Sequence, residues 1–296
     1  MRKITVLLLI LISTGAVIFS YTVLTSQEPV EEEAETIKIA AFNIQVFGIS
    51  KRQKEDVMNV LTRIVREFDV ILIQEIRDSS EETVPIFLEE INNVEGLKYQ
   101  YVRSERLGRS TSKEAYAYIY NAVTVKFVDG SDYVYDDVYD VFERAPYIAS
   151  FVSGNFDFTI IGIHVKPDDA YSEIGNLTGV VQFVLSENPD EKDTIVMGDF
   201  NADGTYFEEA DVANPFKSSD FYWVITNEMD TMTKTDYSYD RIVLLESTYN
   251  HEYVEESASV FKFDTEYDIM NQTLIWEVSD HYPIYAEFKT DLVDDD

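Results

Sequence analysis

Short apolar runs that alternate with amphipathic segments constrain the fold of this chain most. The runs at residues 37–44, 69–76 and 194–201 have the length and β-branched content of buried strands. Residues 53–68 instead repeat their apolar side chains at helical spacing. Strands outnumber helices in this pattern. The order and count predict an α/β fold, in which a mixed two-sheet core is covered by helices on the outside.

The remaining predicted elements follow the same two patterns. Two further helices are predicted at residues 81–94 and 169–188, and Pro85 lies near the start of the first of them, where proline is tolerated. The further strands are predicted at residues 98–105, 114–121, 122–128, 158–165, 239–245 and 281–289.

The length of the chain favours one large folded domain. With 296 residues, of which 45% are hydrophobic, the chain can bury a sizeable core. We interpret residues 37–290 as this domain and residues 291–296 as an acidic tail. Two smaller domains are the less favoured interpretation.

The N-terminal region has the pattern of a targeting segment. Arg2 and Lys3 precede an uncharged apolar stretch that, as a helix, is long enough to cross about 30 Å of hydrocarbon. We interpret residues 1–26 as a signal peptide or an N-terminal membrane anchor, and residues 27–36 as an acidic linker. Removal and retention both stay open, because no A-x-A cleavage site follows. Basic residues in front of such a segment stay inside, so the rest of the chain is expected outside the cytoplasm, secreted or tethered to the outer face of the membrane.

Cysteine and charge content bound the setting of the protein. The chain has no cysteine, so an exported form has no disulfides, which fits a prokaryotic cell surface better than a eukaryotic secretory route. It carries 56 acidic and 23 basic residues, for a net charge of −33. Such a surface repels polyanions at low salt, but at physiological ionic strength the screening length is only about 8 Å. Net charge therefore does not exclude a phosphate-bearing substrate, and a surface that favours solubility is the simpler interpretation.

Polar residues stand where several predicted strands meet loops. A single polar residue there would indicate only a solvated turn, but five separate segments share this feature. If the strands lie side by side, these side chains converge on one mouth of the core. The residues are Asn43, Glu75, His164, Asp199 with Asn201, and Asp280 with His281.

The chemistry of this set favours a hard cation with histidines beside it. Oxygen ligands without cysteine favour Mg²⁺, Mn²⁺ or Ca²⁺ over zinc. His164 and His281 are then expected to act as acids, bases or phosphate contacts. Each needs a carboxylate at its other ring nitrogen, for which Glu114 and Asp240 are candidates, with ordinary surface acids as the alternative. His251 has no such context, and we interpret it as structural.

Seven sequence segments, taken together, resemble the deoxyribonuclease I branch of the endonuclease/exonuclease/phosphatase superfamily. Segments such as GDFN and SDHYP occur across that superfamily, whereas QEIRDS combined with LGRSTSKE points to the narrower branch. The resemblance spans Ile37 to Lys289. The seven segments are IKIAAFNIQVFG, VILIQEIRDSS, SERLGRSTSKEAY, IIGIHVKPDDA, IVMGDFNAD, YDRIVL and VSDHYPIYAEF.

The resemblance implies both a fold and an activity. The implied fold is a four-layer α/β sandwich with two packed mixed β-sheets flanked by helices, and the implied enzyme is a divalent-metal-dependent endonuclease that nicks DNA. His164 paired with Glu114, and His281 paired with Asp240, would serve as general acid and base. A Mg²⁺ or Mn²⁺ ion and the phosphate oxygens would be held by Asn43, Glu75, Asp199, Asn201 and Asp280.

Substrate contacts are also implied, with one departure. Arg77 would enter the minor groove of DNA, and Arg109 and Arg144 would contact phosphates. Ser112 stands where the family has a tyrosine that packs against a sugar, which puts DNA affinity and cutting preference in doubt. Lys166 would add a phosphate contact. We expect a monomer with DNA as its substrate, and a membrane contact only through an uncleaved N-terminal segment.

Two further departures concern stability. The disulfides of the family are absent, and Gly204 and Tyr237 lie near the positions where the cysteines would stand. Asp230, Thr233 and Thr235 have a spacing similar to a structural Ca²⁺ loop, although the loop is one residue shorter. An ordinary polar turn is the alternative. A bound calcium ion would supply the stiffness that cystines provide elsewhere.

Two other functions compete with DNA cleavage. A phosphodiesterase or phosphatase of the same superfamily would keep the hydrolytic centre but act on phospholipid headgroups or small phosphorylated substrates. A surface-binding module on an inactive hydrolase fold is disfavoured, because every expected polar position is filled.

Overall fold

The computed structural model describes residues 6–9, 12–13, 16–17, 20–23, 35–109 and 111–294. The chain divides into two units, residues 1–34 and 35–296. In the first unit β1 (Val6–Leu9) pairs with β4 (Ser20–Val23), and β2 (Ile12–Ser13) pairs with β3 (Ala16–Val17), both antiparallel.

The first unit therefore differs from a continuous apolar helix. Its described residues satisfy their backbone groups between strands, which is the other local solution for an apolar segment. Among the residues that the structure describes, no helix is both long enough and apolar enough to span a membrane. The rest of residues 1–26, and the linker up to residue 34, lie outside the described residues, as do residues 295–296 of the tail. The signal or anchor, the linker and the tail stay predictions.

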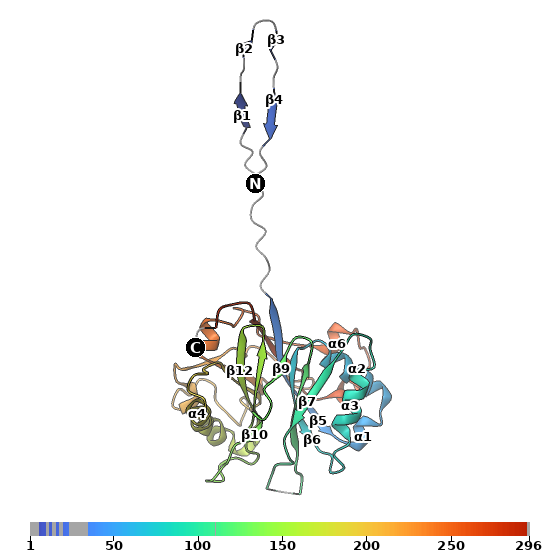
Figure 1. The fold of residues 1–296 in the computed structure, drawn as a ribbon. Coiled ribbons are helices and arrows are strands. Elements are labelled where there is room, and N and C mark those ends of the chain that lie inside the picture. Colours follow the sequence, from blue (N-terminus) through green and yellow to red (C-terminus); the bar gives the residue numbers. More distant parts are fainter. Residues whose placement is uncertain are drawn as a thin grey trace. The chain divides into compact units, whose positions relative to one another are not determined.

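The second unit is built on two sheets packed face to face (Figure 1). The first sheet has the strand order β16-β17-β5-β6-β8-β7. Its strands are β5 (Thr36–Phe47), β6 (Val70–Ile76), β7 (Tyr99–Arg103), β8 (Ala115–Asn121), β16 (Ser259–Val260) and β17 (Ile284–Lys289).

The second sheet has the order β10-β11-β12-β13-β15-β14, and β9 also pairs with β11. Both sheets mix parallel and antiparallel neighbours. The strands of the second sheet are β9 (Lys126–Phe127), β10 (Tyr133–Val134), β11 (Tyr147–Ser153), β12 (Phe156–His164), β13 (Thr194–Asp199), β14 (Phe221–Trp223) and β15 (Asp240–Leu245).

Helices cover the outer faces of both sheets (Figure 1). The first sheet carries α1 (Ile49–Arg52), α2 (Glu55–Val65), α3 (Thr83–Ile91), α6 (Phe263–Glu266) and α7 (Gln272–Val278). The second sheet carries α4 (Ala170–Glu187) with the 3₁₀ turns η1 (Pro167–Asp169) and η2 (Pro215–Lys217), and α5 (Glu246–Asn250) follows β15.

Alternation along the strands explains the four layers. On β8 the side chains of Tyr116 and Tyr118 enter the core between the sheets, whereas those of Ala115 and Ala117 face the helices. A strand that is buried on both faces needs largely apolar side chains at successive positions, as β8 has from Ala115 to Tyr120. The four-layer α/β sandwich with two mixed sheets is therefore confirmed.

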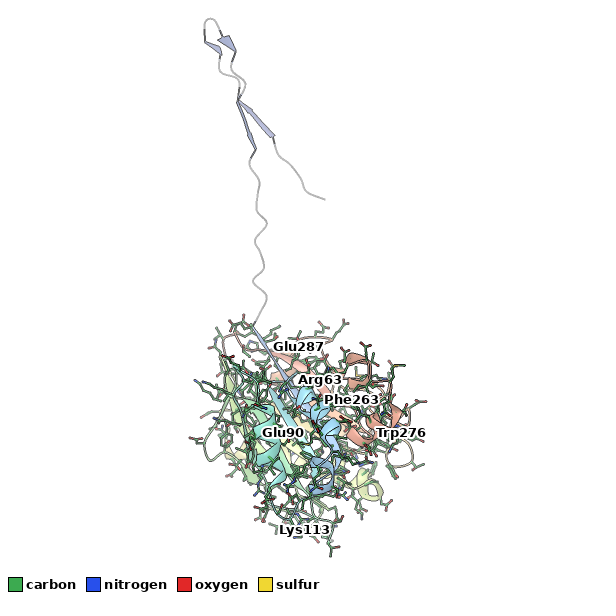
Figure 2. The ribbon with its side chains drawn as sticks, turned by 90° about the vertical axis from the view of Figure 1, so that its right-hand side faces the viewer. Arg63, Glu90, Lys113, Phe263, Trp276 and Glu287 are labelled. Atoms are coloured by element: carbon green, nitrogen blue, oxygen red, sulfur yellow. The ribbon has the colours of Figure 1, made fainter. Side chains whose placement is uncertain are left out.

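The helix α2 forms where helical spacing predicts it. Val57, Leu61 and Ile64 line one face of the helix and pack in the layer between α2 and the first sheet. Glu55 and Asp56 in its first turn interact favourably with the helix dipole. In Figure 2 this helical layer faces the viewer, with Arg63 labelled on α2.

Two local predictions were wrong. Residues 122–128 form a strand only at Lys126–Phe127, because residues 122–124 make a turn in which the Asn121 carbonyl accepts from the Thr124 and Val125 amides. The first strand is longer than the predicted run at residues 37–44. It continues to Phe47 through an irregularity in its pairing with β6.

Strand direction brings the predicted site residues to one edge. β5 runs parallel to β6, and β12 runs parallel to β13, so the carboxyl ends of these strands lie at the same edge of their sheets. β8, β15 and β17 are antiparallel to them and therefore begin at that edge. Figure 2 shows Lys113, which precedes Glu114, at this end of the sandwich and Glu287 of β17 near the other end.

Aromatic contact joins the loops where the resemblance places a disulfide. The Tyr237 ring lies so close to Gly204 that a Cβ on the glycine would be 3.3 Å from it. Tyr237 also stacks on Tyr239, with ring centroids 5.3 Å apart. The Asp203 carboxylate accepts a hydrogen bond from the Ser238 amide at 2.8 Å. Packing and hydrogen bonds therefore link these two loops in a chain that has no cysteine.

Candidate active site

Three neighbouring strands place three site residues side by side. His164 pairs with Asp199 across β12 and β13, and Asp199 pairs with Asp240 across β13 and β15. Gly198 precedes Asp199 with a φ of +139°, and a Cβ there would lie 2.1 Å from the Ile163 carbonyl oxygen. Only glycine permits this approach of the two strands. The approach explains why a glycine interrupts an otherwise apolar strand directly before Asp199.

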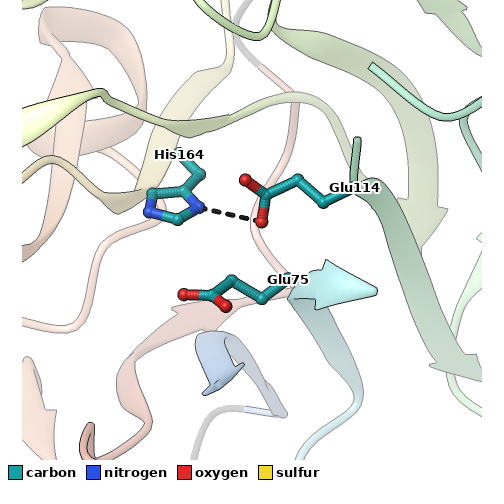
Figure 3. Close-up of side chains that lie close together, drawn as sticks. All are labelled: Glu75, Glu114 and His164. Atoms are coloured by element: carbon teal, nitrogen blue, oxygen red, sulfur yellow. Dashed lines mark hydrogen bonds and ion pairs between the residues drawn. The ribbon is translucent and has the colours of Figure 1, made fainter. Parts of the chain in front are cut away.

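The first histidine–carboxylate pair is His164 with Glu114 (Figure 3). Their Nδ1 and Oε2 atoms are 3.3 Å apart, and Glu114 is buried. The other Glu114 oxygen lies 2.7 Å from a guanidinium nitrogen of Arg144. The His164 backbone amide donates to the Tyr116 hydroxyl at 2.9 Å. Figure 3 also shows Glu75 below this pair, with its carboxylate end under the His164 ring.

The second pair is His281 with Asp240. The His281 Nδ1 atom lies 2.9 Å from the Asp240 Oδ2 atom, and both side chains are buried. The Thr231 hydroxyl donates to the same carboxylate oxygen at 2.8 Å. The His281 backbone amide donates to the Ser279 hydroxyl at 3.1 Å. These contacts fix the His281 ring on its Nδ1 side, so its Nε2 atom points away from Asp240.

Both rings direct Nε2 at one oxygen atom. The Asp199 Oδ2 atom lies 3.4 Å from the His164 Nε2 atom and 3.6 Å from the His281 Nε2 atom. Both pairs therefore direct a ring nitrogen at the same point. A phosphate bound beside Asp199 would lie within reach of two proton-transferring nitrogens.

Both histidines are held towards the protonated form. Burial and the neighbouring Arg144 act to lower the pKa of His164, but Glu114 and Asp199 outweigh them, so its pKa lies above its usual value. Burial also acts to lower the pKa of His281, but Asp240 and Asp199 raise it to about 10. The surroundings of the two rings differ, because Arg144 acts on His164 and Asp280 acts on His281.

Two of the carboxylates beside the rings, Asp199 and Glu114, have lowered pKa values. Burial acts to raise the pKa of Asp199, yet His281 and His164 bring it below its usual value. Burial acts in the same way on the pKa of Glu114, which His164 and Arg144 lower. Asp240 differs, because burial raises its pKa even though His281 acts to lower it. The site therefore places carboxylates with opposite pKa shifts beside rings whose pKa values are raised, an arrangement suited to acid and base chemistry.

The remaining oxygen groups lie around Asp199. The Asn43 side-chain nitrogen donates to Glu75 at 3.2 Å and to Asp199 at 3.0 Å. Its oxygen accepts from the Gln45 amide at 2.9 Å. Asn43 thus spaces two carboxylates with its nitrogen, whereas the resemblance implied an oxygen facing the metal. Asn201 donates its side-chain nitrogen to the Val165 carbonyl at 2.9 Å, which leaves its oxygen on the opposite side of the amide.

The residues fit a divalent cation. Glu75 and Asp199 are two anionic groups that share one neutral donor, a concentration of negative charge that a cation would neutralise. Within the described part of the chain, two groups bring ligand atoms within 4.8 Å of one another. These groups are Glu75–Glu114–His164 and Asp199–Asp240–His281.

Asp280 also lies at the site but makes a different contact. Its carboxylate accepts from the Gln45 side chain at 2.6 Å, and its other oxygen lies 3.9 Å from the His281 Nε2 atom. Gln45 was not predicted from the sequence. Its position in FNIQVF, directly after a predicted strand end, is the signal that could have identified it.

Two of the three predicted substrate arginines lie within the site. Arg77 contacts Glu75 at 3.2 Å and lies 3.9 Å from Glu114. It also donates to the Ser112 hydroxyl at 3.3 Å, at the position where the family has a tyrosine. Arg144 forms its ion pair with Glu114. Both guanidinium groups are therefore part of the catalytic cluster rather than of a separate groove.

The other two cations have local partners. Arg109 is more exposed and forms an ion pair with Asp140 at 2.9 Å, in the loop that leads to Arg144. Lys166, on the loop after His164, forms an ion pair with Asp169 at 2.7 Å. Phosphate contact by either residue stays a prediction and would require it to exchange this partner.

The predicted calcium loop contacts the site through its backbone. Thr233 donates its amide to the Asp280 carbonyl at 2.8 Å and its hydroxyl to the Ser279 carbonyl at 3.0 Å. Asp230 lies 3.5 Å from the Lys262 ammonium, and Thr235 is exposed in the same loop. The loop therefore supports the segment before β17 that contains Asp280. Calcium binding in the loop stays a prediction.

Two buried polar residues near the site were not predicted. Gln74 donates to the Ile163 carbonyl at 2.6 Å and accepts from the Asp199 amide at 3.2 Å, which joins the two sheets beside the site. A glutamine in an otherwise apolar strand was an available signal. Thr231 fixes Asp240, but its position in a polar loop gave no signal.

Comparisons with known proteins agree with this geometry. A family model described as the endonuclease/exonuclease/phosphatase family matches residues 40–246. Deoxyribonuclease-1 from Bos taurus is 36% identical over 260 residues, covering 84% of this chain and 91% of that protein. Deoxyribonuclease gamma from Homo sapiens is 36% identical over 267 residues and covers 86% of each chain.

Solved structures share the fold at lower identity. An endonuclease/exonuclease/phosphatase family protein from Bacteroides thetaiotaomicron has a TM-score of 0.60 at 16% identity, covering 88% of this chain and 100% of that chain. A humanized D. rerio TDP2 has a TM-score of 0.59 at 16% identity, covering 86% and 99%. The chain belongs to the endonuclease/exonuclease/phosphatase family and is a hydrolase of its deoxyribonuclease I branch.

Proposed function

We propose that this protein is an extracytoplasmic, divalent-metal-dependent endonuclease that hydrolyses phosphodiester bonds of DNA. The observation that carries the proposal is the pair of histidines whose Nε2 atoms lie 3.4 and 3.6 Å from one oxygen of Asp199. Relatives named as deoxyribonucleases, matched over most of their length, support DNA as the substrate. The apolar N-terminal stretch after two basic residues supports export.

The histidines divide the proton transfers between them. One neutral ring takes a proton from the attacking water at Nε2, and the other, protonated, gives a proton to the departing 3′ oxygen. The pKa values favour His281 as the acid, because its pKa of about 10 keeps it protonated. We assign the base role to His164, because Arg144 beside it acts against protonation, although Glu114 and Asp199 keep its pKa above the usual value. Each positioned acid or base contributes about 10²- to 10⁴-fold to the rate.

The carboxylates and the arginines hold and orient the phosphate. Glu75, Asp199 and Asp280, with the oxygen of Asn201, are the groups that would hold a Mg²⁺ or Mn²⁺ ion. When bound, that ion supplies positive charge to the phosphate oxygens as negative charge develops on them. Arg77 and Arg144 stand beside Glu114, where each can contact a further phosphate oxygen.

The alternative substrate class keeps the same centre. A phospholipid headgroup or small phosphorylated molecule would use the two histidines in the same way and would need no grip beyond the cleaved group. Four of the 23 basic residues, namely Arg103 at the end of β7 and Arg106, Arg109 and Lys113 on the loop that follows, favour a longer polyanion. We therefore place DNA first.

A plasmid nicking assay tests the proposal. We expect the purified protein to convert supercoiled plasmid to the relaxed form with Mg²⁺ or Mn²⁺, and a chelator to abolish the conversion. The His164→Ala and His281→Ala variants, purified in the same way, control for contaminating nuclease. Plasmid that stays supercoiled under all metal conditions, together with hydrolysis of a phospholipid headgroup or sugar phosphate, would favour the alternative. A salt series then reports how many phosphates the protein engages.

A further inference from the structure

Lys51 is a buried cation close to the site that the proposed chemistry does not use. It lies on α1 with 9% of its surface exposed. Its ammonium donates to the Ile44 carbonyl at 2.5 Å and to the Val278 carbonyl at 3.0 Å. Burial lowers the pKa of Lys51 to about 8, although Asp280 and Glu75 act to raise it. A buried ammonium is costly to the fold, so its presence needs a reason beyond packing.

The two carbonyls belong to the two segments that form one side of the site. Ile44 lies between Asn43 and Gln45, which contact Asp199 and Asp280. Val278 ends α7, two residues before Asp280 and three before His281. Lys51 therefore contacts, with one group, the backbone that carries the oxygen cluster and the backbone that carries an acid–base residue.

The sheet does not join these segments at that point. The ladder between β5 and β17 runs from Thr36 paired with Lys289 to Ala41 paired with Ile284, and it stops before the site. Beyond it, side chains make the connection. The Ser279 hydroxyl donates to the Asn43 carbonyl at 2.6 Å, and Gln45 donates to Asp280 at 2.6 Å. The Lys51 ammonium supplies two further bonds to the same connection.

The backbone after Ile44 needs such support. Gln45 and Val46 have φ values of +49° and +55°, in the left-handed region that non-glycine residues rarely adopt. Such residues persist only where their surroundings determine the conformation. The Val46 amide donates to Glu75 at 2.9 Å, so the turn also sets the position of that carboxylate. A change at Ile44 would therefore reach Gln45 and Glu75 together.

We propose that Lys51 is a positioning residue, whose buried ammonium fixes the distance between the Asn43–Gln45 segment and the Asp280–His281 segment. The proposal rests on the proposed phosphodiester hydrolysis at this site. It predicts that the ammonium matters for the rate of the chemical step rather than for substrate affinity, because Lys51 does not face the phosphate. A lysine that served only the stability of the fold would lack this signature.

The kinetic test uses Lys51→Met, which keeps the length and apolar packing of the chain but removes the donor. We expect kcat to fall at least tenfold on supercoiled plasmid and on bis(p-nitrophenyl) phosphate, with KM changed less than twofold. Arg66→Met is the matched control, because Arg66 donates to the Ile91 and Glu90 carbonyls at 3.0 and 2.8 Å in the same helical layer, away from the site. Its kcat should stay within twofold of wild type.

The absence of cysteine allows a specific rescue. Lys51→Cys, alkylated with 2-bromoethylamine in denaturant and refolded, carries an ammonium on a side chain of nearly the same length, and no other cysteine competes. Rescue of kcat to within threefold of wild type supports the proposal, and alkylation that leaves kcat at the level of Lys51→Met overturns it. A Lys51→Met protein with kcat within twofold of wild type also overturns it.

Hydrogen exchange gives a readout that needs no substrate. In Lys51→Met, but not in Arg66→Met, amide exchange at Gln45, Val46 and His281 should accelerate at least tenfold. Unchanged exchange at these amides overturns the proposal. A wild-type protein that hydrolyses no phosphodiester would refute the proposed function but would leave this exchange result to decide the role of Lys51 in positioning the segments.

Discussion

The two histidine–carboxylate pairs share one geometry but stand in different electrostatic surroundings. Glu114 of the first pair is also contacted by Arg144 at 2.7 Å, with Arg77 at 3.9 Å. Asp240 of the second pair has a neutral hydroxyl, that of Thr231, as its further contact at 2.8 Å. Burial and Arg144 act to lower the pKa of His164. Burial acts in the same way on His281, but Asp240, Asp199 and Asp280 raise its pKa to about 10.

This difference suggests how one pair of identical side chains acquires two roles. Groups whose surroundings push their pKa values apart are suited to act as acid and base in one reaction. Here the surroundings differ in the position of Arg144, which contacts Glu114, and in that of Asp280, which lies 3.9 Å from the His281 Nε2 atom. The arginines beside Glu114 are also suited to bind a polyanion. Neutralisation of the phosphate charge and the basicity of His164 therefore depend on the same part of the site.

Removal of either ring should give the largest effect. We expect His164→Ala and His281→Ala each to lower kcat on plasmid DNA by about 10²- to 10⁴-fold, because each removes one proton-transferring group. Single-turnover nicking with Mg²⁺ measures this loss. His251→Ala is the control, because that histidine follows α5 and contacts Glu252 instead of the site residues. A loss of kcat in only one of these two variants would show that only one histidine–carboxylate pair is catalytic.

Replacing the two orienting carboxylates should destabilise the folded protein to different extents. Both Glu114→Gln and Asp240→Asn should lower kcat at least about tenfold, because the ring loses its orienting anion. Glu114→Gln also leaves Arg144, whose side chain is 11% exposed, without its partner. In urea titrations we therefore expect the free energy of unfolding of Glu114→Gln to be about 3 kcal/mol below that of wild type. An equal or larger loss for Asp240→Asn would contradict the assigned role of the arginine.

The pH dependence of stability should reveal the protonated His281. Its pKa is about 10 in the folded protein and about 6.5 when unfolded, so protonation favours the folded state. This contribution is fully present below about pH 6.5 and is lost as pH rises towards 10. In the presence of chelator, the stability difference between wild type and His281→Asn should shrink by roughly 4 kcal/mol from pH 6 to pH 9.5. A difference that grows with pH would show that the ring is neutral in the fold.

The smallest expected effect concerns the contribution of Arg109 to DNA binding. Arg109→Ala should raise KM for DNA by about two- to fivefold and make the salt dependence shallower, because an exposed residue paired with Asp140 contributes little. Hydrolysis of bis(p-nitrophenyl) phosphate should not change. Asp140→Ala, which frees Arg109 from its ion pair, should lower KM for DNA. Equal effects of Arg109→Ala on both substrates would argue against an extended DNA grip on this side.

The fold and the main chemical groups of the site were open to prediction from sequence. Buried strands leave an apolar pattern, and a polar residue at the end of such a strand stands out, as His164 and Asp199 do. The rules of strand direction then bring those ends to one edge. The pairing of Glu114 with His164 came from the family resemblance, because a single acidic residue before a strand carries no signal of its own.

The rest depends on contacts between distant segments. Asn43 faces Asp199 with its nitrogen because Gln45 follows in a left-handed turn, and sequence patterns do not specify that turn for a non-glycine residue. The Lys51 contact with Val278 joins residues 227 positions apart. Such details are set by how the elements pack, so the sequence shows which groups are present but not which atoms face each other.

The most direct test of the central claim follows the three histidines at once by nitrogen NMR. A short phosphorothioate DNA duplex is titrated into the protein with Mg²⁺, and the side-chain resonances of His164, His281 and His251 are recorded. The structure predicts that the Nε2 signals of His164 and His281 shift with the same half-saturation while His251 stays unchanged, because both rings face one phosphate beside Asp199. A shift of only one of the two rings, or different half-saturation values, would contradict a single site flanked by two pairs.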